Sequence, residues 1–173
     1  MAQGRSPVSE PALPTALVVD CSIVAGMFLA DEQSPLAARV RDASADLTLY
    51  APRLLRVEFA NVALMARRRG RLDESQFVAL LSQGAQFPIQ YDTEEPSLVE
   101  YAESAYALGL TSYDYAYLDC ARRRRVPLAT LDRNLVAAAT RAGVPVLDDP
   151  ARLAEPGIVY AARQKRAPRT ARR

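Results

Sequence analysis

Short apolar segments recur along this chain, and helix-like stretches separate them. We expect five of these segments to be strands, at residues 16–20, 47–51, 87–91, 127–131 and 144–147. The first is apolar up to its last residue, as strands buried on both faces of a parallel sheet are. Strands that alternate with helical stretches are typical of α/β domains. The pattern therefore predicts a three-layer α/β/α domain with a mostly parallel central sheet of about five strands.

Residues that start and stop helices lie between these segments. Ser34 and Pro35 suit the N-cap and first position of a helix that runs to about residue 43. Pro52 is expected to begin a long helix that ends at Gly70. The other expected helices are a short helix or turn at 22–30, one capped by Asp73 with Gln76 as its capping box, one capped by Thr93 and stopped by Gly109, one over 113–125 capped by Thr111 or Ser112, and one over 133–142 stopped by Gly143.

The two ends of the chain differ from the segment between them. Residues 1–15 hold three prolines and few large apolar side chains, so we predict a disordered leader there, a folded domain over 16–150, and a tail over 151–173. The tail is basic: after the last acid, Glu155, come six of the 22 basic residues, namely Arg163, Lys165, Arg166, Arg169, Arg172 and Arg173. Such a tail either binds nucleic acid or is a solvated extension without a partner.

Composition excludes several classes of function. The chain has no histidine, so it has no Ser-His-Asp triad, no Cys-His pair and no histidine-based ribonuclease site. Cys21 and Cys120 are too few for the usual zinc site or a disulfide framework, and both are expected to be core residues. No apolar run reaches the roughly 18 residues of a membrane span. We expect a cytoplasmic protein that does not contact a membrane.

Four acidic residues lie at or near the ends of the apolar segments. Asp20 and Asp132 end two predicted strands, Asp114 lies in the first turn of a predicted helix, and Glu58 lies about two turns into another. Taken alone, each acid is best interpreted as a surface carboxylate or a helix cap. In an α/β sheet, however, all four would meet at the carboxyl edge, where reactive crevices lie. Converging carboxylates repel one another unless a cation holds them, and oxygen ligands suit Mg²⁺ or Mn²⁺. The pattern predicts a metal site for phosphate chemistry.

Polar residues near these acids fit the same site. Ser22 follows Asp20 by two residues and Thr130 precedes Asp132 by two, so either hydroxyl is able to hold a carboxylate or a metal-bound water. Local capping explains both hydroxyls equally well. Asn134 is also within reach of the site.

Four segments resemble a known family when they are taken in order. They are LVVDCS (17–22), APRLLRVE (51–58), LTSYDYAYL (110–118) and PLATLDR (127–133). Together they resemble the PIN-domain ribonucleases, specifically the VapC-type toxins of bacterial type II toxin–antitoxin systems. The resemblance implies a PIN fold, RNA cleavage that depends on one or two Mg²⁺ or Mn²⁺ ions, a homodimer, and inhibition by a small VapB-like antitoxin. It assigns the catalytic and metal-binding roles to Asp20, Glu58, Asp114 and Asp132.

Other charged and aromatic residues stay open to two interpretations. Asp119 lies about 140° round a helix from Asp114, and Arg123 at i+4 is expected to pair with it at the surface. The arginine runs 67–69 and 122–125 either favour helix C-termini or contact RNA, for which we single out Arg67, Arg68, Arg69 and Arg133. The tyrosines at 113, 115 and 117 either line an RNA groove or belong to the core or an interface.

Two kinds of rival function remain, another phosphate protein and a non-catalytic binding module. A haloacid-dehalogenase-like phosphatase requires an Asp at the position of Ser22 and a catalytic Lys, but the only Lys is Lys165 in the tail. A phosphorelay receiver is disfavoured by the same missing Lys. The other rival is a degenerate PIN domain that binds RNA or protein without catalysis. The presence of all four acids argues against that alternative.

Overall fold

The computed structural model describes residues 12–147. The predicted basic tail at 151–173 and most of the predicted leader therefore lie outside the described residues. Within 12–147, no helix combines the length and the apolar character that crossing a membrane requires.

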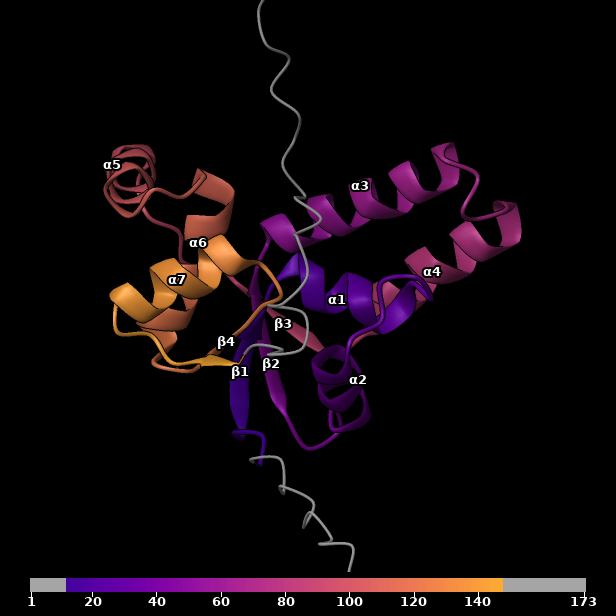
Figure 1. Cartoon of the computed structure of the whole chain (residues 1–173), viewed down its shortest axis with the longest axis horizontal. Coiled ribbons are helices and arrows are strands. Elements are labelled where there is room, and N and C mark those ends of the chain that lie inside the picture. Colours follow the sequence, from indigo (N-terminus) through magenta and orange to yellow (C-terminus); the bar gives the residue numbers. More distant parts are fainter. Residues whose placement is uncertain (1–11, 148–173) are drawn as a thin grey trace, which may run out of the picture.

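A five-stranded sheet forms the centre of the domain, and the prediction of a parallel α/β sheet is confirmed (Figure 1). Its strands are β1 (Ala16–Val19), β2 (Thr48–Pro52), β3 (Ile89–Asp92), β4 (Leu128–Ala129) and β5 (Val146–Leu147). Their order across the sheet is β3-β2-β1-β4-β5, and every neighbouring pair is parallel. All five predicted strands are present, although β4 and β5 contain only two residues each.

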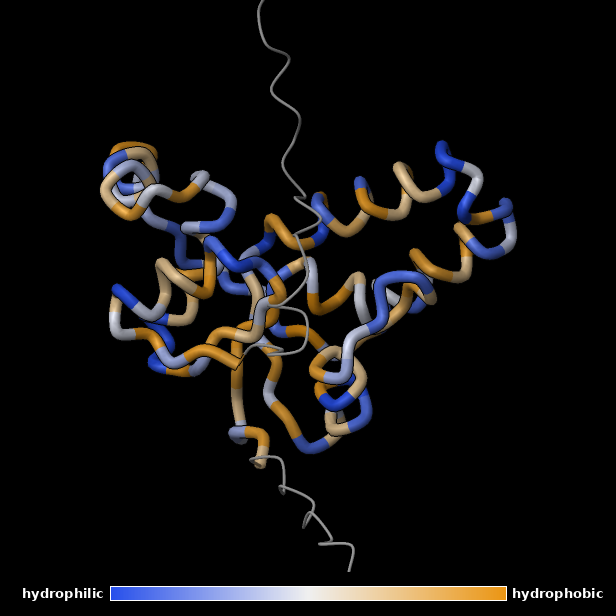
Figure 2. Tube along the Cα trace, viewed as in Figure 1, coloured by the Kyte–Doolittle hydropathy of each residue, from blue (hydrophilic) through white to orange (hydrophobic). Residues whose placement is uncertain are grey.

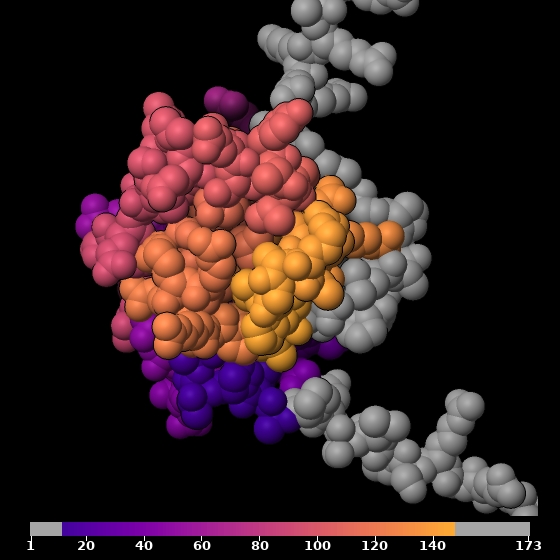
Figure 3. Space-filling view, turned by 90° about the vertical axis from the view of Figure 1, so that its left-hand side faces the viewer, coloured from indigo at the N-terminus to yellow at the C-terminus, as the bar shows by residue number. Residues whose placement is uncertain are grey.

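Helices cover both faces of the sheet, as connections between parallel strands require. One side carries α1 (Cys21–Phe28), α2 (Pro35–Asp42), α3 (Leu54–Arg68) and α4 (Glu74–Gln86), and the other carries α5 (Leu98–Leu108), α6 (Ser112–Arg124) and α7 (Arg133–Arg141) (Figure 1). Figure 3 views the side covered by α5, α6 and α7. The apolar residues gather along the sheet and the inner helix faces (Figure 2). Leu17, Val18 and Val19 of β1 are fully buried there.

Most of the predicted helix ends are confirmed. Ser34 caps α2, Asp73 caps α4 in a capping box with Gln76, and Thr111 rather than Ser112 caps α6. Gly109 and Gly143 follow α5 and α7 with φ of 68° and 72°, a left-handed conformation that glycine adopts without a steric penalty.

Two predicted helix starts are wrong. Thr93 does not cap α5, because Pro96 disfavours a helical conformation in the residue before it and because Ser97 forms a capping box with Glu100. Pro52 is the last residue of β2, so α3 begins two residues later, at Leu54.

The strand order reverses at β1, where neighbouring strands are followed by connections on opposite faces of the sheet. The chain moves from β1 to β2 and β3, then crosses the other face to β4 on the far side of β1. Ligands of open α/β sheets bind at such a reversal, beyond the carboxyl ends of the strands. The backbone N–H of Asp20 donates to the carbonyl of Ala129 over 3.1 Å, which holds the ends of β1 and β4 side by side.

Candidate active site

Asp20 is the buried centre of the acidic site. It follows β1 directly and caps α1, because its Oδ1 accepts from the backbone N–H of Ile23 over 3.1 Å. The same oxygen accepts from Ser22 Oγ over 2.6 Å, and Oδ2 accepts from the hydroxyl of Thr130. Burial raises the pKa of Asp20 to about 6, although these hydrogen bonds lower it and the nearby carboxylate of Asp132 raises it slightly.

The two hydroxyls that contact Asp20 also hold the loop after β4. Ser22 Oγ accepts from the backbone N–H of Leu131 over 2.9 Å, and Thr130 Oγ1 accepts from that of Asp132 over 3.0 Å. Each hydroxyl therefore donates to the Asp20 carboxylate and accepts from the loop that carries Asp132. They position two of the four acids relative to each other, so both predicted hydroxyls lie in the acidic site.

Glu58 reaches the site from the other side of the sheet edge. Because α3 begins at Leu54, Glu58 lies little more than one turn into the helix rather than the predicted two. Its Oε2 accepts a hydrogen bond from the hydroxyl of Tyr117, which the sequence analysis did not anticipate. Partial burial raises the pKa of Glu58, and the carboxylates of Asp20 and Asp114 add to that rise while the Tyr117 bond opposes it.

Asp114 and Asp132 stand at the starts of two helices. Asp114 Oδ2 accepts from Thr111 Oγ1 over 2.7 Å, and burial raises its pKa with a further contribution from Asp132. Asp132 caps α7, since its Oδ1 accepts from the backbone N–H groups of Asn134 and Leu135 over 2.7 and 3.0 Å. Two of the four acids, Asp20 and Asp132, thus serve as helix caps within the same cluster.

The four carboxylates influence one another electrostatically. The carboxylate of Asp132 raises the pKa values of Asp20 and Asp114. The carboxylates of Asp20 and Asp114 raise the pKa of Glu58. Among the described residues, no arginine contributes to the pKa shifts of Asp20, Glu58 or Asp114. The site is therefore acidic, and no basic side chain of the described residues lowers the pKa of these three carboxyl groups.

The four carboxylates fit a divalent cation by their chemistry, because carboxylate oxygens are the ligands that Mg²⁺ and Mn²⁺ prefer. Within residues 12–147, however, no three Asp, Glu, His or Cys side chains already form a cage of ligand spacing. Hydroxyl and N–H partners hold each acid separately, as expected for like charges that repel one another. Side-chain movements would be needed to bring the acids together around a cation.

The predicted arginine contacts lie at different distances from these acids. Arg67 pairs with Glu74 and lies over the Phe77 ring, 4.9 Å from its centroid. Arg68 and Arg69 are exposed at the end of α3, roughly 15 Å along the helix from Glu58 at 1.5 Å per residue. Only Arg133, the first residue of α7, is adjacent to an acid of the site.

A second acidic cluster lies on the C-terminal half of α6. Asp119 accepts from Arg123 over 2.7 Å, as predicted; the side chain of Asp119 is only 5% exposed and that of Arg123 is 28% exposed, so the pair is partly buried. Arg123 also donates to Asp92 over 2.7 Å, and Arg124 donates to Asp92 over 3.0 Å. Burial alone would raise the pKa of Asp92, but these arginines and the N–H of Glu94 lower it to about 2.

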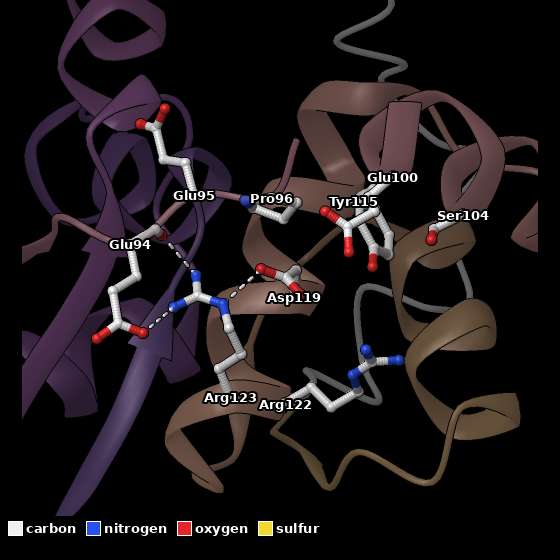
Figure 4. A pocket seen from close by; sticks show the side chains of 9 residues that line it. All are labelled: Glu94, Glu95, Pro96, Glu100, Ser104, Tyr115, Asp119, Arg122 and Arg123. Carbon is white, nitrogen blue, oxygen red and sulfur yellow. Dashed lines mark hydrogen bonds and ion pairs between the residues drawn. The ribbon is translucent and has the colours of Figure 1, made fainter. Parts of the chain in front are cut away.

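Sequence reasoning missed Asp92 although a signal was present. Asp92 ends the apolar segment of β3 in the same way that Asp20 follows β1. Next to it, a cavity of about 340 Å³ lies between residues 94–96, α5 and α6, and Asp119 and Arg123 are part of its wall (Figure 4). None of the four acids Asp20, Glu58, Asp114 and Asp132 lines this cavity. The cavity and the acidic site are therefore separate features.

The fold and the acidic site define the class of this protein. Residues 17–140 match the PIN domain family, and the chain belongs to that family. It is 32% identical to Ribonuclease VapC3 of Pyrobaculum aerophilum over 123 residues, which are 69% of this chain and 91% of that protein.

Solved structures share the fold. The crystal structure of PAE2754 from Pyrobaculum aerophilum has a TM-score of 0.59 at 24% identity and covers 78% of this chain and 89% of its own. FitAB bound to the IR36 DNA fragment has a TM-score of 0.54 at 17% identity, covering 76% and 94%. FitAcB from Neisseria gonorrhoeae has a TM-score of 0.53, also at 17% identity, covering 76% and 96%.

Proposed function

We propose that the protein is a metal-dependent endoribonuclease that acts as the toxin of a toxin–antitoxin pair. One observation carries the proposal: four carboxylates gather at the carboxyl edge of a parallel sheet, where burial and neighbouring carboxylates raise the pKa values of Asp20, Glu58 and Asp114. The similarity to Ribonuclease VapC3 indicates RNA as the substrate.

Asp20, Asp114 and Asp132 would hold one or two Mg²⁺ or Mn²⁺ ions, with Glu58 as a direct ligand or a partner through water. Such ions supply positive charge that makes a water molecule more acidic and stabilises the oxygens of the reacting phosphate. Ser22 and Thr130 keep the Asp20 carboxylate in place beside the loop of Asp132. In-line attack on phosphorus does not require the 2′-hydroxyl, so a preference for RNA must come from binding.

Arg133 is the first choice among the proposed substrate contacts, because it is adjacent to Asp132 in the first turn of α7. Arg68 and Arg69 would contact a longer RNA at the far end of α3. We further propose that the protein is cytoplasmic, forms a homodimer and is inhibited by a VapB-like antitoxin. Support for these partners comes from the resemblance to VapC-type proteins.

The test is cleavage of a mixed RNA pool by the purified protein with Mn²⁺ or Mg²⁺, and with EDTA. Asp114→Asn is the site variant, and Asp46→Asn, which changes an exposed acid, is its matched control. Cleavage that requires metal, persists in the control and disappears in Asp114→Asn supports the nuclease. Intact RNA with the folded wild type under every condition would favour a binding module without catalysis.

A further inference from the structure

Tyr117 connects the two helix layers at the acidic edge of the sheet. Tyr117 lies one turn after Asp114 on α6 and is only 2% exposed. Its hydroxyl donates to Oε2 of Glu58, which is 59 residues away in sequence and belongs to α3 on the other side of the sheet. A buried tyrosine hydroxyl normally requires a partner, and here the partner is one of the four acids.

Glu58 needs such an anchor more than the other acids do. Asp20 and Asp132 have short side chains that are fixed by caps at the starts of α1 and α7. Glu58 has one more rotatable bond, projects from the middle of a helix turn, and caps no helix. Holding a glutamate side chain in one rotamer costs conformational entropy, which a fixed hydrogen-bond partner offsets. The ring of Tyr117 is fixed by burial, so its hydroxyl is a rigid donor.

Tyr117 is the donor in this contact, because a phenol carries an O–H whereas the ionised carboxylate of Glu58 only accepts. Since Oε2 is occupied, Oε1 is the Glu58 oxygen that remains for other partners.

We propose that Tyr117 is a positioning residue that fixes Glu58 with Oε2 engaged and Oε1 available to a divalent cation or its bound water. This inference rests on the proposed cation site and adds a residue to it. Tyr115 provides a contrast on the same helix, because it is 4% exposed and packs edge-on against Tyr101, with centroids 6.1 Å apart. Tyr115 is thus a core tyrosine of similar burial whose ring contacts Tyr101. Within the described residues, no hydrogen bond joins its hydroxyl to one of the four acids.

The test measures Mn²⁺ affinity by titration calorimetry for the wild type, Tyr117→Phe, Tyr115→Phe, Glu58→Gln, and Glu58→Gln combined with Tyr117→Phe. Loss of a residue that orients a metal ligand typically costs about 10–100-fold in metal affinity or activity, and we expect that loss in Tyr117→Phe. Tyr115→Phe should stay within about twofold of the wild type. In the Glu58→Gln background, Tyr117→Phe should add less than about threefold, because coupled residues are not additive.

Wild-type affinity in Tyr117→Phe, or an equal loss with and without Glu58, would overturn the inference. So would a wild type that binds no Mn²⁺. If Tyr117→Phe does not fold, the Cζ signals of the eight tyrosines provide a second measurement by NMR. One signal is expected to shift with Mg²⁺ in the wild type and not in Glu58→Gln, and an unchanged wild-type spectrum contradicts the role.

RNA cleavage separates this inference from the proposed function. A wild type that binds Mn²⁺ with the expected Tyr117–Glu58 coupling but cuts no RNA would keep the positioning role and reject the nuclease. Metal-dependent cleavage with equal Mn²⁺ affinity in the wild type and Tyr117→Phe would keep the nuclease and reject the positioning role.

Discussion

Helix α6 carries two acidic clusters that differ in how their charge is neutralised. Near its start, Asp114 lies with Asp20, Glu58 and Asp132, which accept hydrogen bonds from hydroxyls and backbone N–H groups. In its second half, Asp119 lies with Asp92, and Arg123 and Arg124 neutralise both. Asp20 and Asp92 both expose 5% of their surface or less, but burial raises the pKa of Asp20 to about 6, whereas its arginine partners lower the pKa of Asp92 to about 2.

The difference supports the proposed roles of the two clusters. Paired acids stabilise the fold in their ionised form, whereas buried acids without a cationic partner destabilise it until a cation binds from outside. Strongly shifted carboxylates are candidates for functional sites when no structural partner explains the shift. The comparison therefore supports the proposed cation binding at the first cluster and a stabilising role for the second.

The largest expected effect concerns catalysis at the first cluster. Asp114→Asn should lower RNA cleavage by at least about 10³-fold, because a ligand of the proposed cation is lost. Asp92→Asn should leave the rate per folded molecule within a few-fold of the wild type. Initial rates at matched folded concentration measure both. A comparable loss in both variants would contradict the separation of the two clusters.

Removing Arg123 should have the largest effect on stability. Arg123→Met leaves Asp119 without its ion pair and Asp92 with one arginine. Because both carboxylates are buried but Arg123 is 28% exposed, the loss should be about 3 kcal/mol, the low end of the cost of breaking a buried pair. The control is Arg122→Met, which replaces an exposed neighbour and should change the free energy of unfolding by less than about 0.5 kcal/mol. Urea unfolding measures both. A small change in Arg123→Met would show that the cluster contributes little.

Asp20→Asn should stabilise the metal-free protein at neutral pH. The folded pKa of about 6 is above the usual 3.8, so the folded state binds more protons and ionised Asp20 destabilises it above pH 6. The variant should gain up to about 3 kcal/mol at pH 7.5, and the gain should vanish below pH 4. Urea unfolding with EDTA at several pH values measures it. A destabilised variant at pH 7.5 would contradict the assignment.

Asp92 should produce the opposite dependence on pH. Its folded pKa of about 2 is below 3.8, so its contribution is present above pH 4 and is lost as the pH falls through 2. The wild type should lose about 2 kcal/mol of stability over this range relative to Asp92→Asn. Acid titration of the two proteins gives the difference. Parallel curves would mean that Asp92 is not held as an ionised partner.

The smallest effect concerns the arginines at the end of α3, which belong to neither cluster. If Arg68 and Arg69 contact RNA, replacing both with alanine should reduce the slope of log affinity against log salt by about 1.4, or about 0.7 per contact with single strands. Binding of RNA to Asp114→Asn at several salt concentrations measures the slope. An unchanged slope would remove these residues from the proposed RNA surface.

Local patterns predicted the sheet and indicated the four acids whose carboxylates influence one another, but they did not predict the contacts of those acids. The apolar segments predicted all five strands, and the spacing of Asp20 and Asp132 after them placed both acids at one edge. The Tyr117–Glu58 and Arg123–Asp92 contacts join residues 59 and 31 positions apart, and only tertiary packing determines them. Thr93 failed as a helix start because a stronger capping box lay four residues later.

The caps at Asp20 and Asp132 have a practical consequence for building inactive versions of this protein. At either position, alanine would remove the start of a helix together with a charge, and the lost cap alone costs about 1 kcal/mol. Asparagine caps a helix as well as aspartate does, so it removes the charge and keeps the cap. Asp114 begins no helix, since Thr111 caps α6. It is therefore the acid whose replacement reports most cleanly on chemistry rather than on folding.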